Sequence, residues 1–183
     1  MSYAQAAIAY LERELQPEDA DSSGVSPGES GNRASTTGMM PAPLNDKHWG
    51  RVSQLSFADV ATEGPWTIRR SSRSVWIDRM LATSAVGAKL SFAFEGTGLA
   101  LAFDFGKRSA DFRYRINGGE PAVHVFDRQD WCPDEGMFQL AVVAGDLPSG
   151  KHHAELEVVH GDGPGCTGTR FKLAFIGVIQ ESR

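Results

Sequence analysis

The stretch from Lys89 to Gly119 most constrains the fold of this chain, because apolar and polar residues alternate along it in three successive runs. The apolar positions are Leu90, Phe92 and Phe94, then Leu99, Leu101, Phe103 and Phe105, then Phe112, Tyr114 and Ile116. Successive side chains of a β-strand point to opposite faces. The pattern therefore predicts three adjacent antiparallel strands with one apolar and one wetter face, the latter carrying Asp111, Arg113 and Arg115 in the third strand.

Short strands separated by turn residues are predicted over most of the remaining chain. We expect further strands near residues 51–57, 66–69, 74–83, 122–126, 137–144, 152–159 and 170–179. Glycine, proline, aspartate or asparagine stands at most boundaries, and Asn117-Gly118 is the strongest hairpin signal among them. Short strands with no helical pattern between them predict an all-β fold, a two-sheet antiparallel β-sandwich of the jelly-roll type.

The N-terminal part has a different character. Ile8, Leu11 and Leu15 recur at helical spacing, and Pro17 follows, so residues 1–16 are predicted to form a helix. Residues 17–45 are rich in serine, glycine, aspartate and proline, a composition typical of a flexible linker. The predicted β-sandwich module then covers residues 46–183.

Composition and charge exclude several classes of function. The 183 residues have a net charge of -5, whereas nucleic-acid and anionic-membrane partners usually require a basic excess. The sequence has no apolar run of the roughly 20 residues that cross a bilayer, and it lacks the pattern of a signal peptide. We therefore expect a cytoplasmic protein if Met1 is the true start, with neither nucleic acid nor membrane as partner.

Two cysteines, Cys132 and Cys166, fall in loop-like sequence. Free thiols are favoured in a cytoplasmic chain, and a single bridge between loops at one end of the sandwich is the alternative. Neither cysteine has the spacing of a zinc ligand. No metal and no cofactor is predicted.

Two motifs in the linker imitate functional sites. Gly24-Val25-Ser26-Pro27-Gly28 matches Gly-x-Ser-x-Gly, but a nucleophile elbow needs a strand before the serine and a helix after it. Asp19, Asp21 and Gly24 imitate the front of a calcium loop, whose twelfth position is Ser30 instead of glutamate. Both are interpreted as linker sequence.

Histidines and carboxylates offer a second set of candidates. His152 and His153 are neighbours on a strand, so they point to opposite faces and cannot share one ion by themselves. We interpret them, together with His124 and His160, as surface or strand-edge residues. A cluster of carboxylates surrounds Trp131 and Cys132, formed by Asp127, Asp130, Asp134 and Glu135. A glycosidase needs two carboxyl groups at a defined separation, which a loop cluster does not establish, so we interpret it as a solvated loop.

Tryptophans at strand ends are the best candidates for ligand binding. Trp66, Trp76 and Trp131 lie outside the alternating pattern, as does Trp49. An exposed indole beside polar groups can stack on the apolar face of a sugar, whereas a buried one plugs the end of the sandwich. Trp131 and its neighbour Asp130 are the preferred ligand-binding residues, with Trp66 and Trp76 as further candidates.

Two segments resemble known proteins. Tyr3-Ala4-Gln5-Ala6-Ala7-Ile8-Ala9-Tyr10-Leu11 is similar to the C-terminal helix of SGNH/GDSL-type hydrolases. Phe94-Glu95-Gly96-Thr97-Gly98, followed by Ile116-Asn117-Gly118, resembles the β-sandwich accessory domain of some of those hydrolases and of carbohydrate esterases, with Asn117 in place of an aspartate. The resemblance implies a carbohydrate or polysaccharide ligand and a hydrolase catalytic domain as neighbour.

The catalytic motifs of that family are absent from this sequence. The chain has no Gly-Asp-Ser block, no Gly-x-Asn block and no Asp-x-x-His before the N-terminal helix, so no catalytic residue is assigned. Three hypotheses follow. The first is a non-catalytic carbohydrate-binding accessory module, and the second is a structural sandwich that packs on a hydrolase domain without a ligand. The third is an esterase that uses residues of this chain alone, with Ser26 as the nucleophile to test. A C-terminal fragment of an SGNH hydrolase is a further alternative.

Overall fold

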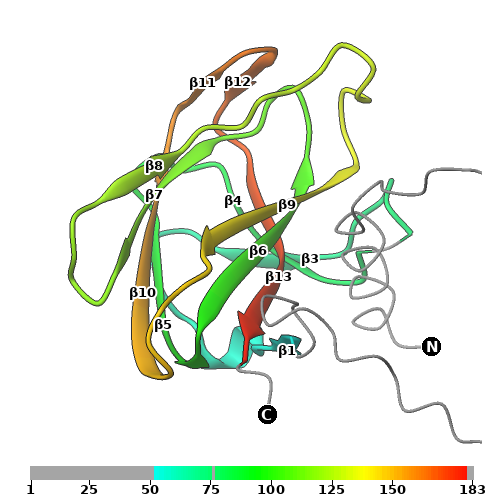
Figure 1. Ribbon diagram of the computed structural model, residues 1–183. Coiled ribbons are helices and arrows are strands. Elements are labelled where there is room, and N and C mark those ends of the chain that lie inside the picture. The colour runs from blue at the N-terminus through cyan, green and yellow to red at the C-terminus, as the bar shows by residue number, and fades with distance from the viewer. Residues whose placement is uncertain (1–51, 76, 181–183) are drawn as a thin grey trace, which may run out of the picture. The chain divides into compact units, whose positions relative to one another are not determined.

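The computed structural model describes residues 52–75 and 77–180, which belong to the unit Arg51–Arg183 (Figure 1). The predicted helix at residues 1–16 and the predicted linker at 17–45 lie outside the described residues. Within the described ranges, no helix has the length and apolarity needed to cross a membrane.

Two antiparallel sheets form a β-sandwich, as predicted. Sheet A has the order β3-β4-β13-β6-β9 with β1 paired to β13, and its strands are β1 (Val52–Gln54), β3 (Thr67–Arg69), β4 (Met80–Thr83), β6 (Gly98–Phe105), β9 (Met137–Ala144) and β13 (Phe171–Ile179). Sheet B has the order β2-β5-β10-β7-β8, with β2 (Ala61–Glu63), β5 (Lys89–Gly96), β7 (Asp111–Ile116), β8 (Ala122–His124) and β10 (Gly150–Val159). A separate hairpin pairs β11 (Gly161–Gly163) with β12 (Cys166–Gly168).

The apolar core lies between the sheets. Alternate residues of β5, β7 and β10 face alternate residues of β6 and β13. Phe103 is central, since its ring centroid lies 5.3 Å from Phe112, 5.1 Å from Phe126 and 5.4 Å from Phe171. Burying each large apolar side chain stabilises the fold by about 1.5–3 kcal/mol, so this cluster holds the two sheets together.

The prediction that the three runs between Lys89 and Gly119 form adjacent strands is wrong. β5 and β7 belong to sheet B with β10 between them, whereas β6 crosses into sheet A and pairs with β13 and β9. The crossing occurs at Gly96-Thr97-Gly98, where a Cβ on Gly96 would lie 2.3 Å from the Ile179 carbonyl oxygen. Because only glycine permits this close approach to the end of β13, the turn can bring β6 alongside β13 in sheet A instead of back alongside β5 in sheet B.

Other boundaries also differ from the prediction. β4 begins at Met80 and not near Ser74, and the first predicted strand ends at Gln54, before a 3₁₀ turn at Phe57–Asp59. β2 was not predicted, because three residues are too short to show alternation. The β11–β12 hairpin, which follows β10, was not among the predicted strands.

The hairpin predicted at Asn117-Gly118 is confirmed. Both residues have positive φ, 52° and 68°, and the Gly119 N–H donates to the Ile116 carbonyl at 3.0 Å. A type I′ turn requires this geometry, and it joins β7 to β8.

Candidate functional site

The loop between β8 and β9, residues 125–136, presents the most exposed aromatic residue of the described chain. The Trp131 side chain is 74% exposed, and Asp130 beside it is exposed as well. The Cys132 N–H donates to the Gln129 carbonyl at 3.0 Å, which places Trp131 within a tight turn. Large aromatic side chains are usually buried, so this exposed indole makes the loop the candidate site among the described residues.

Arg128 braces this loop from inside. Its guanidinium donates to the Pro133 carbonyl at 3.4 Å, to the Cys132 carbonyl, and to the Asp134 carboxylate at 2.8 Å. Its side chain is only 11% exposed. The planar guanidinium of Arg128 thereby bonds to three successive residues after Trp131 and ties down this part of the loop.

Neighbouring segments anchor the same loop. The Lys107 N–H donates to the Asp134 carbonyl at 2.8 Å, and the Arg128 N–H donates to the Pro164 carbonyl at 3.0 Å. The buried Asp111 carboxylate accepts from the backbone N–H of Phe126 at 2.9 Å and of Asp162 at 3.1 Å. Asp111 was predicted on the wetter face of its strand, but it is buried because two other segments donate to it.

A polar hollow of about 530 Å³ lies between the loop and its neighbours. Its lining comes from the β3–β4 loop, the β6–β7 turn, the Trp131 loop and β12, through Arg73, Lys107, Arg108, Asp134, Glu135 and Thr167. The lining contains both cationic donors and carboxylate acceptors.

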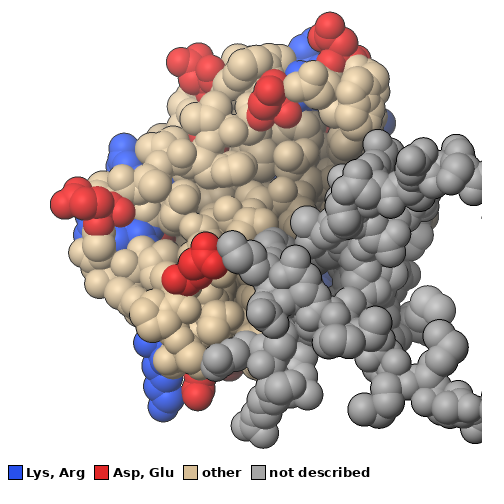
Figure 2. All heavy atoms as spheres, in the orientation of Figure 1, with Lys and Arg blue, Asp and Glu red and all other residues tan. Residues whose placement is uncertain are grey.

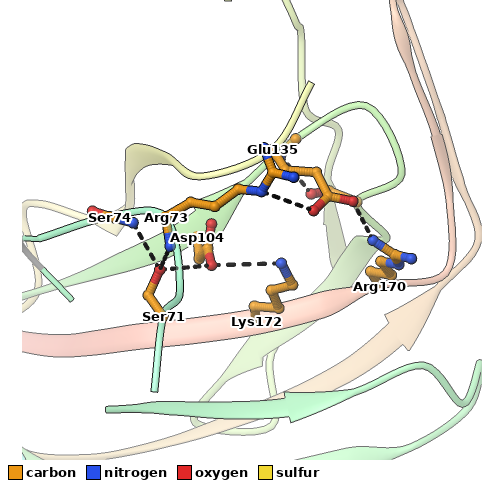
Figure 3. A network of polar contacts seen from close by, with 9 residues as sticks. Ser71, Arg73, Ser74, Asp104, Glu135, Arg170 and Lys172 are labelled. Carbon is orange, nitrogen blue, oxygen red and sulfur yellow. Dashed lines mark hydrogen bonds and ion pairs between the residues drawn. The ribbon is translucent and has the colours of Figure 1, made fainter. Parts of the chain in front are cut away.

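Glu135 is held between two arginines at the wall of this hollow (Figure 3). Arg170 donates a hydrogen bond to its carboxylate, and the Arg73 Nε lies 3.7 Å from the second oxygen. The hydrogen bond from Arg170 lowers the pKa of Glu135 below its ordinary value. Glu135 is therefore ionised and already paired, which makes it a structural anion and not a proton donor at neutral pH.

Asp104 lies beside this network on the outer face of sheet A (Figure 3). Its side chain is 4% exposed, with one oxygen 3.5 Å from the Lys172 Nζ and 3.3 Å from the Ser71 Oγ. Ser71 in turn accepts from the Ser74 N–H at 3.0 Å. The other oxygen, Oδ1, has no hydrogen-bond partner among the described residues. Asp104 thus ties the β3–β4 loop to the sheet.

The histidines have structural environments. His153 is exposed, but His152 is buried, so the prediction of a surface histidine is wrong there. Its Nε2 lies 2.7 Å from the Pro148 carbonyl and its Nδ1 lies 2.8 Å from the Asn117 side-chain amide, so both ring nitrogens are engaged. His124 stacks on Phe112 at 4.9 Å, and burial lowers its pKa, an effect that Asp111 partly offsets.

The described residues hold no catalytic or metal-binding constellation. No group of three or more histidine, cysteine, aspartate or glutamate side chains is placed to hold a metal ion within 52–75 and 77–180. Cys132 and Cys166 are buried and free, and burial raises the pKa of the Cys166 thiol. The motifs at Ser26 and at Asp19 lie outside the described residues.

A second hollow of about 510 Å³ lies on the outer face of sheet B. It is crossed by two ion pairs between neighbouring strands, Arg113 with Glu157 at 3.0 Å and Arg115 with Glu155 at 4.0 Å. Cross-strand pairs of this kind are usual on a solvated sheet face. The face is therefore a weaker candidate than the Trp131 loop.

Solved structures similar to this chain include proteins that act on or bind carbohydrates. A two-domain esterase active on acetylated mannans, co-crystallised with mannopentaose, aligns with a TM-score of 0.61 and 15% identity over 78% of this chain and 40% of that chain. A family 35 carbohydrate-binding module from Clostridium thermocellum aligns with a TM-score of 0.50 and 10% identity, over 71% of this chain and 98% of that one. The likeness is one of fold.

The chain thus spans less than half of the esterase, and its match with the binding module covers nearly all of that module. A second crystal structure of a two-domain esterase active on acetylated mannans aligns with a TM-score of 0.59 and 15% identity, over 97% of this chain and 46% of that chain. No family model and no curated protein matches the sequence.

The structure places the sequence-predicted ligand-binding residues in different environments. Trp131 and Asp130 stand together on the exposed loop, as predicted. Trp66 instead packs edge-on against Phe171 at 5.9 Å and donates from its indole to the Glu63 carbonyl at 3.0 Å. Trp76 lies outside the described residues. The hydrogen bonds from Arg128 to the loop were not predicted, because an arginine before a proline-containing loop is not a specific sequence signal for such contacts.

Proposed function

We propose that this chain is a non-catalytic carbohydrate-binding accessory module whose ligand stacks on Trp131. The observation that carries the proposal is the 74% exposed indole on a loop braced by Arg128. The β-sandwich fold, shared with an esterase active on acetylated mannans and with a carbohydrate-binding module, supports the ligand class.

The physical basis is the two-sided character of a sugar ring. Its C–H faces are apolar and stack on an aromatic ring, while its hydroxyls need hydrogen-bond partners at the edge. Around Trp131 these partners are Asp130 and the Gln129 amide, which itself donates to Asp127 at 3.1 Å. Because Arg128 has already ordered the loop, little conformational entropy is lost when the ligand binds.

The polar hollow beside the loop extends the proposed site. Asp134 belongs both to the loop held by Arg128 and to the lining of the hollow of about 530 Å³. A ligand that stacks on Trp131 therefore continues toward Lys107 and Arg108, whose cationic groups donate hydrogen bonds to hydroxyl or carbonyl oxygens. An oligosaccharide is favoured over a single sugar by this geometry.

Isothermal titration calorimetry of the chain with a polysaccharide panel tests the proposal, and tryptophan fluorescence of the wild type is a second measurement. The panel includes acetylated mannan and the same mannan after deacetylation. Trp131→Ala is expected to weaken binding by about tenfold or more, because it removes both the stacking contact and the apolar area that a bound sugar would cover. The free energy of unfolding is expected to change by only about 0.5 kcal/mol, since the side chain is exposed.

Two control variants separate the proposed site from the rest of the fold. Val125→Ala removes a half-exposed apolar side chain from the same loop and is expected to leave affinity unchanged. Trp66→Phe changes a packed indole and is expected to leave affinity unchanged as well. If no glycan binds in the calorimetric titration, the binding function is wrong; if binding survives in Trp131→Ala, the site is wrong.

The proposal includes a hydrolase domain as neighbour, in keeping with the resemblance of residues 3–11 to the last helix of SGNH/GDSL-type hydrolases. The likeness to an esterase of which this chain matches 40–46% supports such an arrangement. Gene sequence upstream of the Met1 codon is expected to encode Gly-Asp-Ser and Asp-x-x-His in frame. A stop codon in frame directly before Met1 would contradict a covalently attached catalytic domain.

A further inference from the structure

The edge strands of the two sheets are unequal. Four of them, β1, β2, β3 and β8, are each three residues long. The longest is β9, which runs for eight residues from Met137 to Ala144 and pairs on one side only among the described residues, with β6. Short edge strands leave few unpaired backbone groups, whereas β9 leaves a full row of them.

β9 also lacks the side chains that usually protect an open edge. Its sequence, Met-Phe-Gln-Leu-Ala-Val-Val-Ala, contains no charged residue and no proline. Phe138, Leu140 and Val142 pair with Asp104, Ala102 and Ala100 of β6, so they lie on the outer face of sheet A and not in the core. Val142 is 46% exposed. Figure 2 shows mainly uncharged residues over the visible part of this region.

Comparison with β8 shows what is unusual about β9. Val123 of β8 is 52% exposed, but β8 has only three residues and lies next to the hairpin turn. A long, uncharged and apolar edge is a template for pairing with another strand, by the same backbone hydrogen bonds that build the sheet. β9 therefore has the features of an interaction surface, and β8 does not.

We propose that β9 pairs antiparallel with β9 of a second copy of this chain, across a two-fold axis, and joins the two copies of sheet A into one continuous sheet. The matching strand must have about the same length and an apolar outer face, and among the described strands with a free edge only β9 meets both conditions. In such a pairing residue i of one copy lies opposite residue j of the other and residue j opposite residue i, so a charge on β9 would face another β9 side chain across the contact. β9 carries none.

The proposed pairing joins the apolar outer faces of the two copies. Phe138, Leu140 and Val142 of one copy then continue into the same residues of the other. Burial of this area and the new ladder of backbone hydrogen bonds act together, as they do between neighbouring strands within sheet A. This pairing does not depend on carbohydrate binding, since the Trp131 indole is not part of β9.

Sedimentation equilibrium of the full chain, over a range of protein concentrations, tests the proposal. The wild type is expected to change from monomer to dimer as concentration rises. Val142→Lys places one charge from each copy within the apolar contact between the two β9 strands and is expected to weaken dimerisation by about tenfold or more. Val123→Lys is the matched control, with the same substitution at a similarly exposed edge position, and it is expected to dimerise as the wild type does.

Amide hydrogen exchange of the wild type provides a second measurement that does not rely on a variant. Exchange of the β9 amides is expected to slow as the dimer forms, while exchange in β8 is unchanged. A chain that stays monomeric at every concentration overturns the proposal. So does a dimer that Val123→Lys weakens and Val142→Lys does not, or one that forms without protection of β9.

Discussion

The two sheets of this protein use their outer faces in opposite ways. In sheet B the two long strands β5 and β10 alternate between buried and more exposed residues, and the outer face carries exposed residues such as Arg113, Arg115 and Glu155. In sheet A all eight residues of β6 are buried, including Ala100 and Ala102, which are not part of the core between the sheets. The difference teaches that one face of the sandwich meets water and the other is built to be covered.

Part of that cover is visible in the β3–β4 loop. Ser71 bonds to Asp104 on the outer face of sheet A, and Ile77, farther along the loop, is buried outside the core cluster (Figure 3). Met80 and Ala82 of β4 are buried outside that cluster as well. A strand with both faces covered reads as a continuous apolar run, as β6 does, and loses the alternation that marks a half-solvated strand.

The largest expected difference between the two outer faces comes from replacing one alanine on each by lysine. Ala102→Lys is expected to reduce the free energy of unfolding by about 3–5 kcal/mol, because it forces an unpaired charge into a buried position. Ala93→Lys, on the exposed face of β5, is expected to change it by only about 0.5 kcal/mol. Denaturant unfolding measures both, and equal losses would contradict the assignment of the two faces.

A second comparison sets the ion pair on sheet A against one on sheet B. Asp104→Ala is expected to cost about 1–3 kcal/mol, since it leaves Lys172 and Ser71 without their partner in a largely buried place. Glu157→Ala removes the exposed partner of Arg113 and is expected to cost less than about 1 kcal/mol. Thermal unfolding of the two variants ranks them, and the reverse order would show that sheet A is open to water near Asp104.

The smallest effect concerns pH. Burial lowers the pKa of His124 in the folded chain below 6.5, so the unfolded chain binds the proton first and stability falls as pH drops through 6.5. Arg170 lowers the pKa of Glu135 below 4.5, so its contribution is present above that value and is lost at lower pH. His124→Phe is expected to flatten the upper step of a stability-against-pH curve, and Glu135→Gln the lower one. Unchanged steps would contradict these environments.

Much of the local structure could be predicted from single residues and their spacing. The period of two in Lys89–Gly96 and Asp111–Ile116 predicted both strands and the side that faces the core. Asn117-Gly118 predicted a turn with positive φ. An isolated tryptophan among polar residues predicted the exposed position of Trp131, whereas its role in binding stays a prediction.

Residues that depend on distant partners could not be predicted in the same way. Asp111, assigned to the wet face, is buried because Phe126 and Asp162 donate to it from other segments. His152 is buried because the Asn117 side chain and the Pro148 carbonyl satisfy its ring. Nothing in the local sequence distinguishes these side chains from their exposed neighbours, since their partners lie far away along the chain.

The sequence by itself determined that this protein is built of antiparallel strands with a sandwich core, because alternation and turn residues act over a few positions. Tertiary structure alone decided that β6 leaves its neighbours in sequence to pair with β13 and β9. It also decided that Arg128 holds the Trp131 loop rigid. The physical reason is that a periodic pattern specifies which way a side chain points, while strand partners and buried polar contacts are chosen by segments that meet only in the folded chain.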